Sequence, residues 1–584
     1  MSDERPPTPV PSAAVVADAL QQLSELLELV GENPFKVRAY QRGAHAVRHL
    51  GEDFESRLRS KTLTEVENIG KSLVAAIEEL VATGKLRILE EVKQKVPPGV
   101  LVLSSVPGLG PKKARQVCEE LGISTLGELE YAATENRLLH LKGFGAKTQA
   151  RILQALRARH ATAGQCRLDV ADEVVAPLLA GLSGMPQVLA ACAVGQVRRR
   201  MELCHQVDLL CSAADVSALL DTLLGGTLLA RPRRERADVV AFEALPGVPG
   251  VLHLVHPDDF AAAQLFQTGP EAHLRALASS SQDWRLTEQG ARRGAERVAF
   301  PTEEAVYAAL GLPWIVPELR DDGTEVDLAR AGQLPRLIEP GDLRGALHNH
   351  TTWSDGRDTA RAMQQAAAAL GLRYLGISDH SQSAFYARGL ARDALATQRE
   401  ELRAASERGG CELWQGVESD ILQDGSLDYP AEVLAELDFV VASIHSRFQH
   451  DAQQMTQRLV NAARNPFTDV MGHPTGRLLL SREPYAFDLV AVLEAARESG
   501  CAMELNAQPQ RLDLGVEQLK LCKRMGVKVC INADAHNTRE LEALRYGVSM
   551  ARRAGLTAAD VVNTLDADGM RAWLRQRRER RAGR

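Results

Sequence analysis

The chain has 584 residues, several times the length of an average domain, so a multi-domain protein is expected. Its 45% hydrophobic and 25% charged residues exclude wholesale disorder, and no apolar run reaches the ~18 residues that a membrane helix needs. The formal charge of -7 excludes a nonspecific polycation but not local contacts with nucleic acid, and nine cysteines without CxxC pairs are typical of a reducing cytoplasm.

Two segments in the helical first part of the chain, 106–112 and 141–147, share the pattern apolar–x–Gly–x–Gly–x–Lys. Glycines let the backbone turn tightly and approach a ligand, and the amides at the start of the following helix bind a phosphate. One such turn could be an ordinary connection between helices, but a weaker third copy at 66–71 makes sequence-independent contact with nucleic acid the better interpretation. The residues predicted to make this contact are Gly70, Gly108, Gly110, Lys112, Gly143, Gly145 and Lys147.

The patterning then becomes mixed, with strand-like stretches such as 201–211 and 237–242, and is followed by a helical segment with Pro-rich breaks and a polar linker. We expect these domains: an N-terminal helical domain (1–95), a helix-hairpin-helix domain (96–164), an α+β domain (165–257), a further helical domain (258–325), a linker (326–344) and a C-terminal domain (345–584).

From residue 345 onward, short apolar stretches that end in polar residues alternate with helical segments. Seven such units predict a parallel, barrel-like sheet, in which chemistry belongs at the carboxyl ends of the strands. The predicted strands are 346–350, 374–379, 413–418, 439–445, 469–473, 502–506 and 527–534.

Six histidines and three carboxylates follow or end these strands. Imidazole with carboxylate and without cysteine selects Mn²⁺, Zn²⁺ or Fe²⁺ over Mg²⁺ or Ca²⁺, and nine ligands are too many for one ion. The pattern predicts two or three divalent ions that share a bridging carboxylate, which suits phosphoester hydrolysis. The predicted ligands are His348, His350, Asp355, His380, Glu418, His445, His473, Asp534 and His536.

These nine residues match, position by position, the ligand pattern of the PHP phosphoesterase domain. The flanking strings LHNHTTWSDG, GISDHS, VASIHSRF, MGHP and NADAH resemble the version that is fused to bacterial family X DNA polymerases. NPFKVRAY at 33–40 and TEEAVYAALGLPWIVPELR at 302–320 resemble the same family, so the resemblance covers almost the whole chain.

The resemblance implies an 8-kDa-like domain, fingers, a nucleotidyltransferase-like palm, a thumb and a distorted (β/α)7 barrel with three metal ions. It further implies a Mn²⁺-favouring 3′→5′ exonuclease. One ion would be held by His348, His350, Glu418 and Asp534, which we expect to be catalytic, a second by Glu418, His445 and His473, and a third by Asp355, His380 and His536. Arg447 and Arg477, each shortly after a ligand, are predicted to hold the substrate phosphate.

The palm departs from the family pattern. A family X palm carries Gly-Ser-x-Arg-Arg, two aspartates one residue apart on a strand and a third on a neighbouring strand, which together hold two Mg²⁺ ions. Here the serine is Gln196, the first aspartate is Gln206, the third falls at Val251, and only Asp208 remains. An amide is a poor Mg²⁺ ligand and valine is none, so we predict a palm that keeps its shape and has lost polymerisation.

Taken together, the sequence predicts a multi-domain α and α/β protein that hydrolyses DNA ends in repair, on gapped, nicked or 3′-recessed duplexes. It is expected in a bacterial cytoplasm near the nucleoid, without membrane contact and with other repair proteins as further partners. Three alternatives stay open: an active template-directed repair polymerase, which needs an acid such as Glu202 to replace the lost aspartates; a non-catalytic DNA-binding scaffold; and a barrel that acts on a small phosphate ester.

Overall fold

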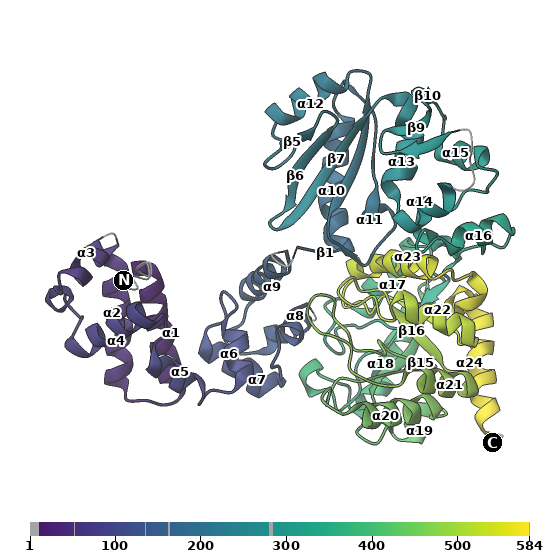
Figure 1. Ribbon diagram of the computed structural model, residues 1–584. Coiled ribbons are helices and arrows are strands. Elements are labelled where there is room, and N and C mark those ends of the chain that lie inside the picture. The colour runs from purple at the N-terminus through teal and green to yellow at the C-terminus, as the bar shows by residue number, and fades with distance from the viewer. Residues whose placement is uncertain (1–10, 52, 135, 162–163, 279–283, 583–584) are drawn as a thin grey trace. The chain divides into compact units, whose positions relative to one another are not determined.

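The computed structural model describes residues 11–51, 53–134, 136–161, 164–278 and 284–582. The chain forms two compact units, Met1–Leu156 and Arg157–Arg584 (Figure 1). No helix within the described ranges is long and apolar enough to cross a membrane.

The first unit is helical. Its first helix buries Leu20, Leu23 and Leu27, whose spacing places them on one face of a helix. The helices are α1 (Ala13–Leu29), α2 (Pro34–Leu50), α3 (Asp53–Arg59), α4 (Lys71–Thr83), α5 (Arg87–Lys93), α6 (Pro98–Ser104), α7 (Pro111–Leu121), α8 (Leu126–Thr134) and α9 (Ala146–Ala161), the last of which continues into the second unit.

The second unit begins with the predicted palm, a five-stranded sheet in the order β2-β4-β7-β6-β5. Strands β4 and β7 run parallel with Asp208 opposite Val251, and the other pairs are antiparallel. The strands are β2 (Val188–Ala193), β4 (Val207–Ala213), β5 (Arg233–Arg236), β6 (Val239–Leu245) and β7 (Val248–Val255), and a small pair joins β1 (Cys166–Arg167) to β3 (Leu203–Cys204). The helices are α10 (Leu168–Ser183), α11 (Gly195–Arg198) and α12 (Val216–Gly225).

The predicted thumb has its own apolar core, built around Leu265, Tyr307 and Ile315. A buried carboxylate, Glu303, joins it to the palm through a two-bonded ion pair with Arg198. The elements are α13 (Phe260–Thr268), α14 (Glu271–Ala278), β8 (Arg285–Thr287), β9 (Gly290–Arg293), β10 (Glu296–Val298), α15 (Glu303–Ala309) and α16 (Thr324–Arg330).

The C-terminal part is the predicted barrel. Its seven strands are parallel neighbours in chain order, and a bridge between Asn349 and Ala535 joins the ends of the sheet. The strands are β11 (Gly345–Ala346), β12 (Tyr374–Ile377), β13 (Glu412–Asp420), β14 (Phe439–Ser443), β15 (Val470–Met471), β16 (Ala502–Asn506) and β17 (Val529–Asn532). The predicted fold class is therefore confirmed.

Helices cover the outside of the barrel, and Figure 1 shows α20, α21, α22 and α24 around its strands. Strand β14 is buried along its whole length, as expected for a parallel strand covered on both faces. The helices are α17 (Ala360–Ala369), α18 (Arg392–Glu407), α19 (Ala431–Ala435), α20 (Ala452–Arg464), α21 (Leu489–Ser499), α22 (Val516–Met525), α23 (Leu544–Arg553) and α24 (Ala567–Ala582).

Candidate functional site

The nine predicted ligands converge at the carboxyl ends of the barrel strands. None of their side chains exposes more than 3% of its surface. Their ligand atoms form overlapping groups in which all atoms lie within 4.8 Å of one another. These groups are His350, Asp355, His380 and His536; His348, His350 and Asp534; His348, Glu418 and His473; and His380, Glu418 and His445.

Glu418, near the end of β13, lies at the centre of this cluster. One carboxylate oxygen is 3.0–3.2 Å from ring nitrogens of three histidines, and the other is 3.1 and 3.6 Å from those of two more. The first three are His348, His445 and His473, and the other two are His380 and His350. A carboxylate in this position can bridge cations, as the sequence predicted.

Two further acids orient the imidazoles from outside the cluster. Glu504 on β16 contacts Nδ1 of His348 at 2.8 Å, and Asp420 contacts Nδ1 of His445 at 2.7 Å. Each contact leaves Nε2 of its histidine directed at Glu418. Neither acid was predicted from the sequence, although each has a signal: Glu504 is a lone acid in a buried apolar strand, and Asp420 follows Glu418 by two residues on the same strand.

Several imidazole nitrogens of the cluster are buried and have no hydrogen-bond partner among the described residues. They are Nε2 of His348, both ring nitrogens of His350 and of His380, and Nε2 of His445. Burial is also the main reason why the pKa of His350 falls to about 3, with the imidazoles of His536 and His380 adding to it. A neutral imidazole is the form that binds a metal ion, and His350 is in that form. Against the effect of burial, neighbouring carboxylates raise the pKa of His348 well above its ordinary value and that of His445 to about 9, so a metal ion would displace a proton from these two imidazoles. Buried imidazoles beside ionised carboxylates fit divalent cations.

The carboxylates of the cluster are ionised. Burial opposes the charge of Glu418, but the imidazoles of His445 and His348 outweigh it and hold the pKa of Glu418 well below its ordinary value. The pKa of Asp534 is likewise held low, chiefly by His348 against the effect of burial. Asp534 also has a φ of +48°, a strained backbone conformation of the kind that gathers at functional sites.

The two arginines predicted to hold the substrate phosphate differ in their surroundings. Arg447 is exposed, two residues after His445. Arg477 instead donates to the backbone carbonyl of Arg511 at 3.0 Å and forms a two-bonded ion pair with Glu202 of the palm. Because its donors are directed at these groups, the geometry argues against a phosphate contact for Arg477.

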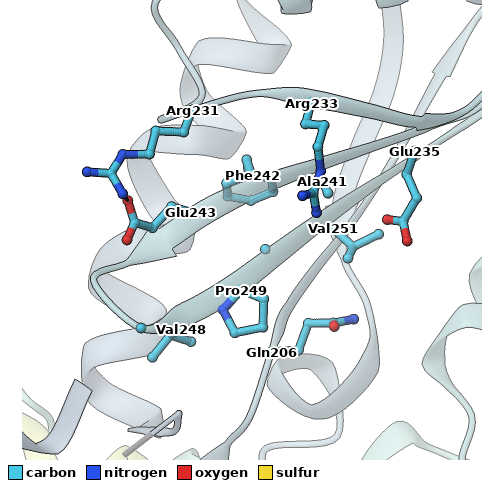
Figure 2. A pocket seen from close by; sticks show the side chains of 12 residues that line it. Gln206, Arg231, Arg233, Glu235, Ala241, Phe242, Glu243, Val248, Pro249 and Val251 are labelled. Atoms are coloured by element: carbon cyan, nitrogen blue, oxygen red, sulfur yellow. Dashed lines mark ion pairs between the residues drawn. The ribbon is translucent and has the colours of Figure 1, made fainter. Parts of the chain in front are cut away.

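In the palm, two of the residues at the predicted polymerase positions, Gln206 and Val251, line a groove of about 510 Å³. Figure 2 shows Gln206 and Val251 on its wall, with Arg231 and Arg233 on the neighbouring part of the sheet. Val251 lies directly opposite Asp208 on the adjacent strand, which is where the third aspartate was expected. Gln196 is turned to the backbone N–H of His205, at 2.8 Å.

Among the described residues, the charged or polar side chains that act on Asp208 are Gln206 and Arg199, and no acid is one of them. Glu243 on β6 and Glu235 on β5 also line the groove, but they lie two and three strands away, roughly 10 and 14 Å at ~4.8 Å per strand. Within the described part of the chain, no group of three potential metal ligands includes Asp208. Burial raises the pKa of Asp208, although the hydrogen bond from Gln206 and the charge of Arg199 act in the opposite direction. This carboxyl is therefore a weaker acid than an ordinary aspartate.

The three hairpin segments of the first unit share one turn. The backbone N–H groups of Ile69, Leu109 and Phe144 each donate to the carbonyl three residues earlier, at 3.0–3.1 Å. Gly108 and Gly143 have φ of +94° and +85°, and Asn68 takes the corresponding place at +68°.

Asparagine is among the few other residues that tolerate this conformation, which explains how the third copy forms without its first glycine. Gly70 and Gly110 are the N-cap residues of α4 and α7, and no side chain caps either helix. The backbone N–H groups of each first turn can therefore meet a phosphate; in α7 they start at Lys112, because Pro111 has none. Lys147 is exposed, whereas Lys112 is paired on the surface with Glu28 at 2.7 Å.

Comparison with known families gives four matches along the chain. Residues 12–86 match a helix-hairpin-helix domain, 100–158 a SAM-like helix-hairpin-helix tandem, 263–321 the DNA polymerase beta thumb, and 346–508 the PHP domain.

Among similar proteins, the DNA polymerase/3'-5' exonuclease PolX of Bacillus subtilis is 34% identical over 567 residues, which cover 95% of this chain and 98% of the relative. A probable phosphatase of Thermoanaerobacter sp. (strain X514) is 31% identical over 184 residues, 30% of this chain and 72% of that protein. A probable phosphatase of Acetivibrio thermocellus is 27% identical over 243 residues, 40% of this chain and 95% of that protein.

The barrel with its imidazole–carboxylate cluster, together with the hairpins and the thumb, defines a hydrolytic enzyme of the nucleic-acid-processing class. The identity with the Bacillus protein extends over nearly the full length of both chains. The chain belongs to family X of the DNA polymerases, in the form that carries a C-terminal PHP domain.

Proposed function

We propose that the barrel is a metal-dependent 3′→5′ exonuclease and phosphoesterase that acts on DNA ends, and that the palm no longer transfers nucleotides. The observation that carries the proposal is the Glu418-centred cluster, in which nine potential ligand side chains form overlapping buried groups. The Bacillus relative is named as a 3'-5' exonuclease as well as a DNA polymerase, which supports the same reaction class.

His348, His350, Glu418 and Asp534 form the catalytic group of this proposal, with the other five ligands around them. Divalent ions held there would supply the positive charge that polarises a phosphoryl group and promotes the ionisation of water. We propose Mn²⁺ as the first ion to test. Imidazole with carboxylate also suits Zn²⁺ or Fe²⁺, and the availability of the three ions decides among them. Arg447, exposed beside the cluster, remains our candidate for the substrate phosphate.

DNA is the proposed partner of the hairpins, in gapped, nicked or 3′-recessed form. The support is the shared turn, the uncapped starts of α4 and α7 and the two family matches. We propose the corresponding division into an 8-kDa-like domain (1–95), fingers (96–164), palm (165–257), thumb (258–325), linker (326–344) and PHP domain (345–584).

The loss of polymerisation is supported by the side chains around Asp208. The alternative of an active polymerase needs a second acid there, and Glu202 was the candidate. Its carboxylate is instead paired with Arg477 of the barrel at 2.8 Å. With an amide at Gln206 and an aliphatic side chain at Val251, Asp208 is the one carboxylate left at the three predicted ligand positions, where phosphoryl transfer requires a pair of dications.

The test uses one gapped DNA substrate with Mn²⁺, in the presence and in the absence of deoxynucleotides. We expect removal of nucleotides from the 3′ end and no extension. A protein that binds the substrate, retains less than about one metal ion per chain and hydrolyses nothing would be the non-catalytic scaffold. Hydrolysis of small phosphate esters alone would favour the small-molecule alternative.

A further inference from the structure

The palm reaches the barrel through an ion pair that lies next to the candidate metal centre. Glu202, between α11 and β3, faces Arg477, which follows the ligand His473 by four residues. Glu202 Oε2 lies 2.8 Å from Nη2 of Arg477, and Oε1 lies 3.2 Å from Nη1. The two side chains are 26% and 13% exposed. A pair with two parallel bonds fixes the plane of the guanidinium as well as its position.

Arg477 in turn holds the loop between β16 and α22. Its Nε donates to the carbonyl of Arg511 at 3.0 Å, and its Nη2 donates to the carbonyl of Leu512. Leu512 has a φ of +43°, which leucine rarely adopts, so this loop conformation depends on support from its surroundings. A Cβ on Gly515 would lie 2.8 Å from Nη1 of Arg477, so the glycine makes room for the guanidinium.

The loop held by Arg477 contacts a metal ligand. Nε of Arg511 lies 3.8 Å from Oδ2 of Asp534, and both side chains are only 2% exposed. The carboxylate of Asp513 accepts the backbone N–H of Thr475 at 3.1 Å, which ties the loop to the segment that carries His473. A shift of this loop would therefore be felt at two ligands, Asp534 and His473.

We infer that Glu202 is a positioning residue of the barrel's metal centre. It orients Arg477, which fixes the loop 507–515 and, through Arg511, the carboxylate of Asp534. The palm thus contributes to hydrolysis from outside the barrel, in a role that does not involve nucleotide transfer. This inference rests on the proposed hydrolytic function of the barrel.

A second ion pair provides a matched control. Glu318 of the thumb lies 2.8 Å from Nε of Arg552 on α23, and the two side chains are 17% and 13% exposed. The other partners of Arg552 are the carbonyl of Ile338 and the carboxylate of Glu339. The substitution Glu318→Gln therefore removes a comparable contact with the barrel without touching the loops that reach the ligands.

The experiment compares Glu202→Gln, Glu202→Asp and Glu318→Gln in the full-length protein. The substrates are a 3′-recessed duplex and bis-p-nitrophenyl phosphate, each assayed over a range of Mn²⁺ concentrations, and Mn²⁺ retained per chain is measured after desalting. The small diester reports on the metal centre alone, because it is too short to contact the hairpins. Thermal unfolding of each variant reports any general loss of stability.

We expect Glu202→Gln to lower kcat about tenfold on both substrates and to raise the half-saturating Mn²⁺ concentration by a similar factor. An effect of this size is typical when a partner that orients a metal ligand is removed. KM for the duplex should stay within about twofold, because the hairpins are untouched. Glu202→Asp should recover part of the loss, and it decides the question if Glu202→Gln does not fold. Glu318→Gln should stay within about twofold of the parent protein in every measurement.

Equal losses in Glu202→Gln and Glu318→Gln would overturn the inference, as would wild-type kcat and Mn²⁺ dependence in Glu202→Gln. A loss confined to KM for the duplex would also overturn it, because it would place Glu202 in DNA binding. If the parent protein hydrolyses neither substrate, it is the proposed function that fails, and the retained Mn²⁺ still decides whether Glu202 supports the metal centre.

Discussion

The barrel and the palm both direct side chains from parallel strands into a site, but among the residues that the structure describes only the barrel gathers a set of three or more potential metal ligands. In the barrel, Glu418 is surrounded by five imidazoles within 3.6 Å. In the palm, Asp208 stands opposite Val251 and beside Gln206, and the two acids that line the neighbouring groove lie two and three strands away. Both sheets are regularly paired, so the contrast lies in their side chains; under the proposed function, two of them, Gln206 and Val251, decide whether the palm holds metal ions.

The palm has kept the parts of its motif that serve its structure. Arg198 makes a two-bonded ion pair with Glu303 of the thumb and also donates to Thr268 at 2.7 Å. Gly195 has no space for a side chain, since a Cβ there would lie 2.2 Å from Oδ2 of Asp208. Arg198 and Gly195 thus have structural roles here, whereas Gln206 and Val251 stand where two of the three ion-binding carboxylates were expected.

The largest expected effect concerns the barrel. His350→Ala should reduce hydrolysis of a 3′-recessed duplex by about 100-fold or more, because it removes a ligand shared by two groups of the cluster. The dissociation constant for the same DNA should change by no more than a few-fold. His205→Ala, which removes an exposed histidine of the palm, is the control, and equal activity in the two variants would contradict the assignment.

The next effect concerns the palm–thumb ion pair and depends on pH. Burial opposes the charge of Glu303, but Arg320 and Arg198 outweigh it and lower the pKa of Glu303 to about 2, from an ordinary value of 4.5. A carboxylate with a lowered folded-state pKa stabilises the protein above pH 4.5, and this contribution is lost as the pH falls towards 2.

The stability difference between the parent protein and Glu303→Gln should therefore shrink by about 2 kcal/mol between pH 6 and pH 3, measured by urea unfolding. Glu304→Gln, which alters the exposed neighbouring carboxylate, should show no such pH dependence. A difference for Glu303→Gln that is the same at both pH values would contradict the role of this pair.

A smaller effect is expected at the hairpins. Replacing Gly108 and Gly143 with valine should weaken binding of a gapped duplex about tenfold, because their φ of +94° and +85° is unfavourable for a β-branched residue. Hydrolysis of bis-p-nitrophenyl phosphate should be unchanged. Gly122→Val is the control, since Gly122 has a φ of +68° but lies at the opposite end of α7. A similar loss of DNA binding in Gly122→Val would contradict a specific role of the hairpin turns in DNA binding.

The barrel and its ligands could be predicted because both follow local rules. Apolar strands that end in polar residues recur along the chain, and parallel order brings those ends together. Five strands, β11, β12, β14, β15 and β17, are shorter than predicted. The shortest are β11 and β15, because the chain leaves the sheet before His348 and His473 and takes a φ of +24° at His473.

The partners of the ligands could not be predicted in the same way. Asp420 meets His445 across neighbouring strands, and Glu504 meets His348 from strands far apart in the sequence, so each pairing depends on register. Arg477 was assigned to a phosphate because it follows His473, yet its carboxylate partner is Glu202, 275 residues away. No local pattern encodes how one domain packs against another.

The central claim is that the barrel is catalytic and the palm is not. The most direct measurement incubates the parent protein, His350→Ala and Asp208→Ala with one gapped duplex, Mn²⁺ and deoxynucleotides, and follows the length of the 3′-ended strand. The account predicts shortening by the parent protein and by Asp208→Ala, no shortening by His350→Ala, and no extension by any of them. Extension by the parent protein that Asp208→Ala abolishes would contradict it.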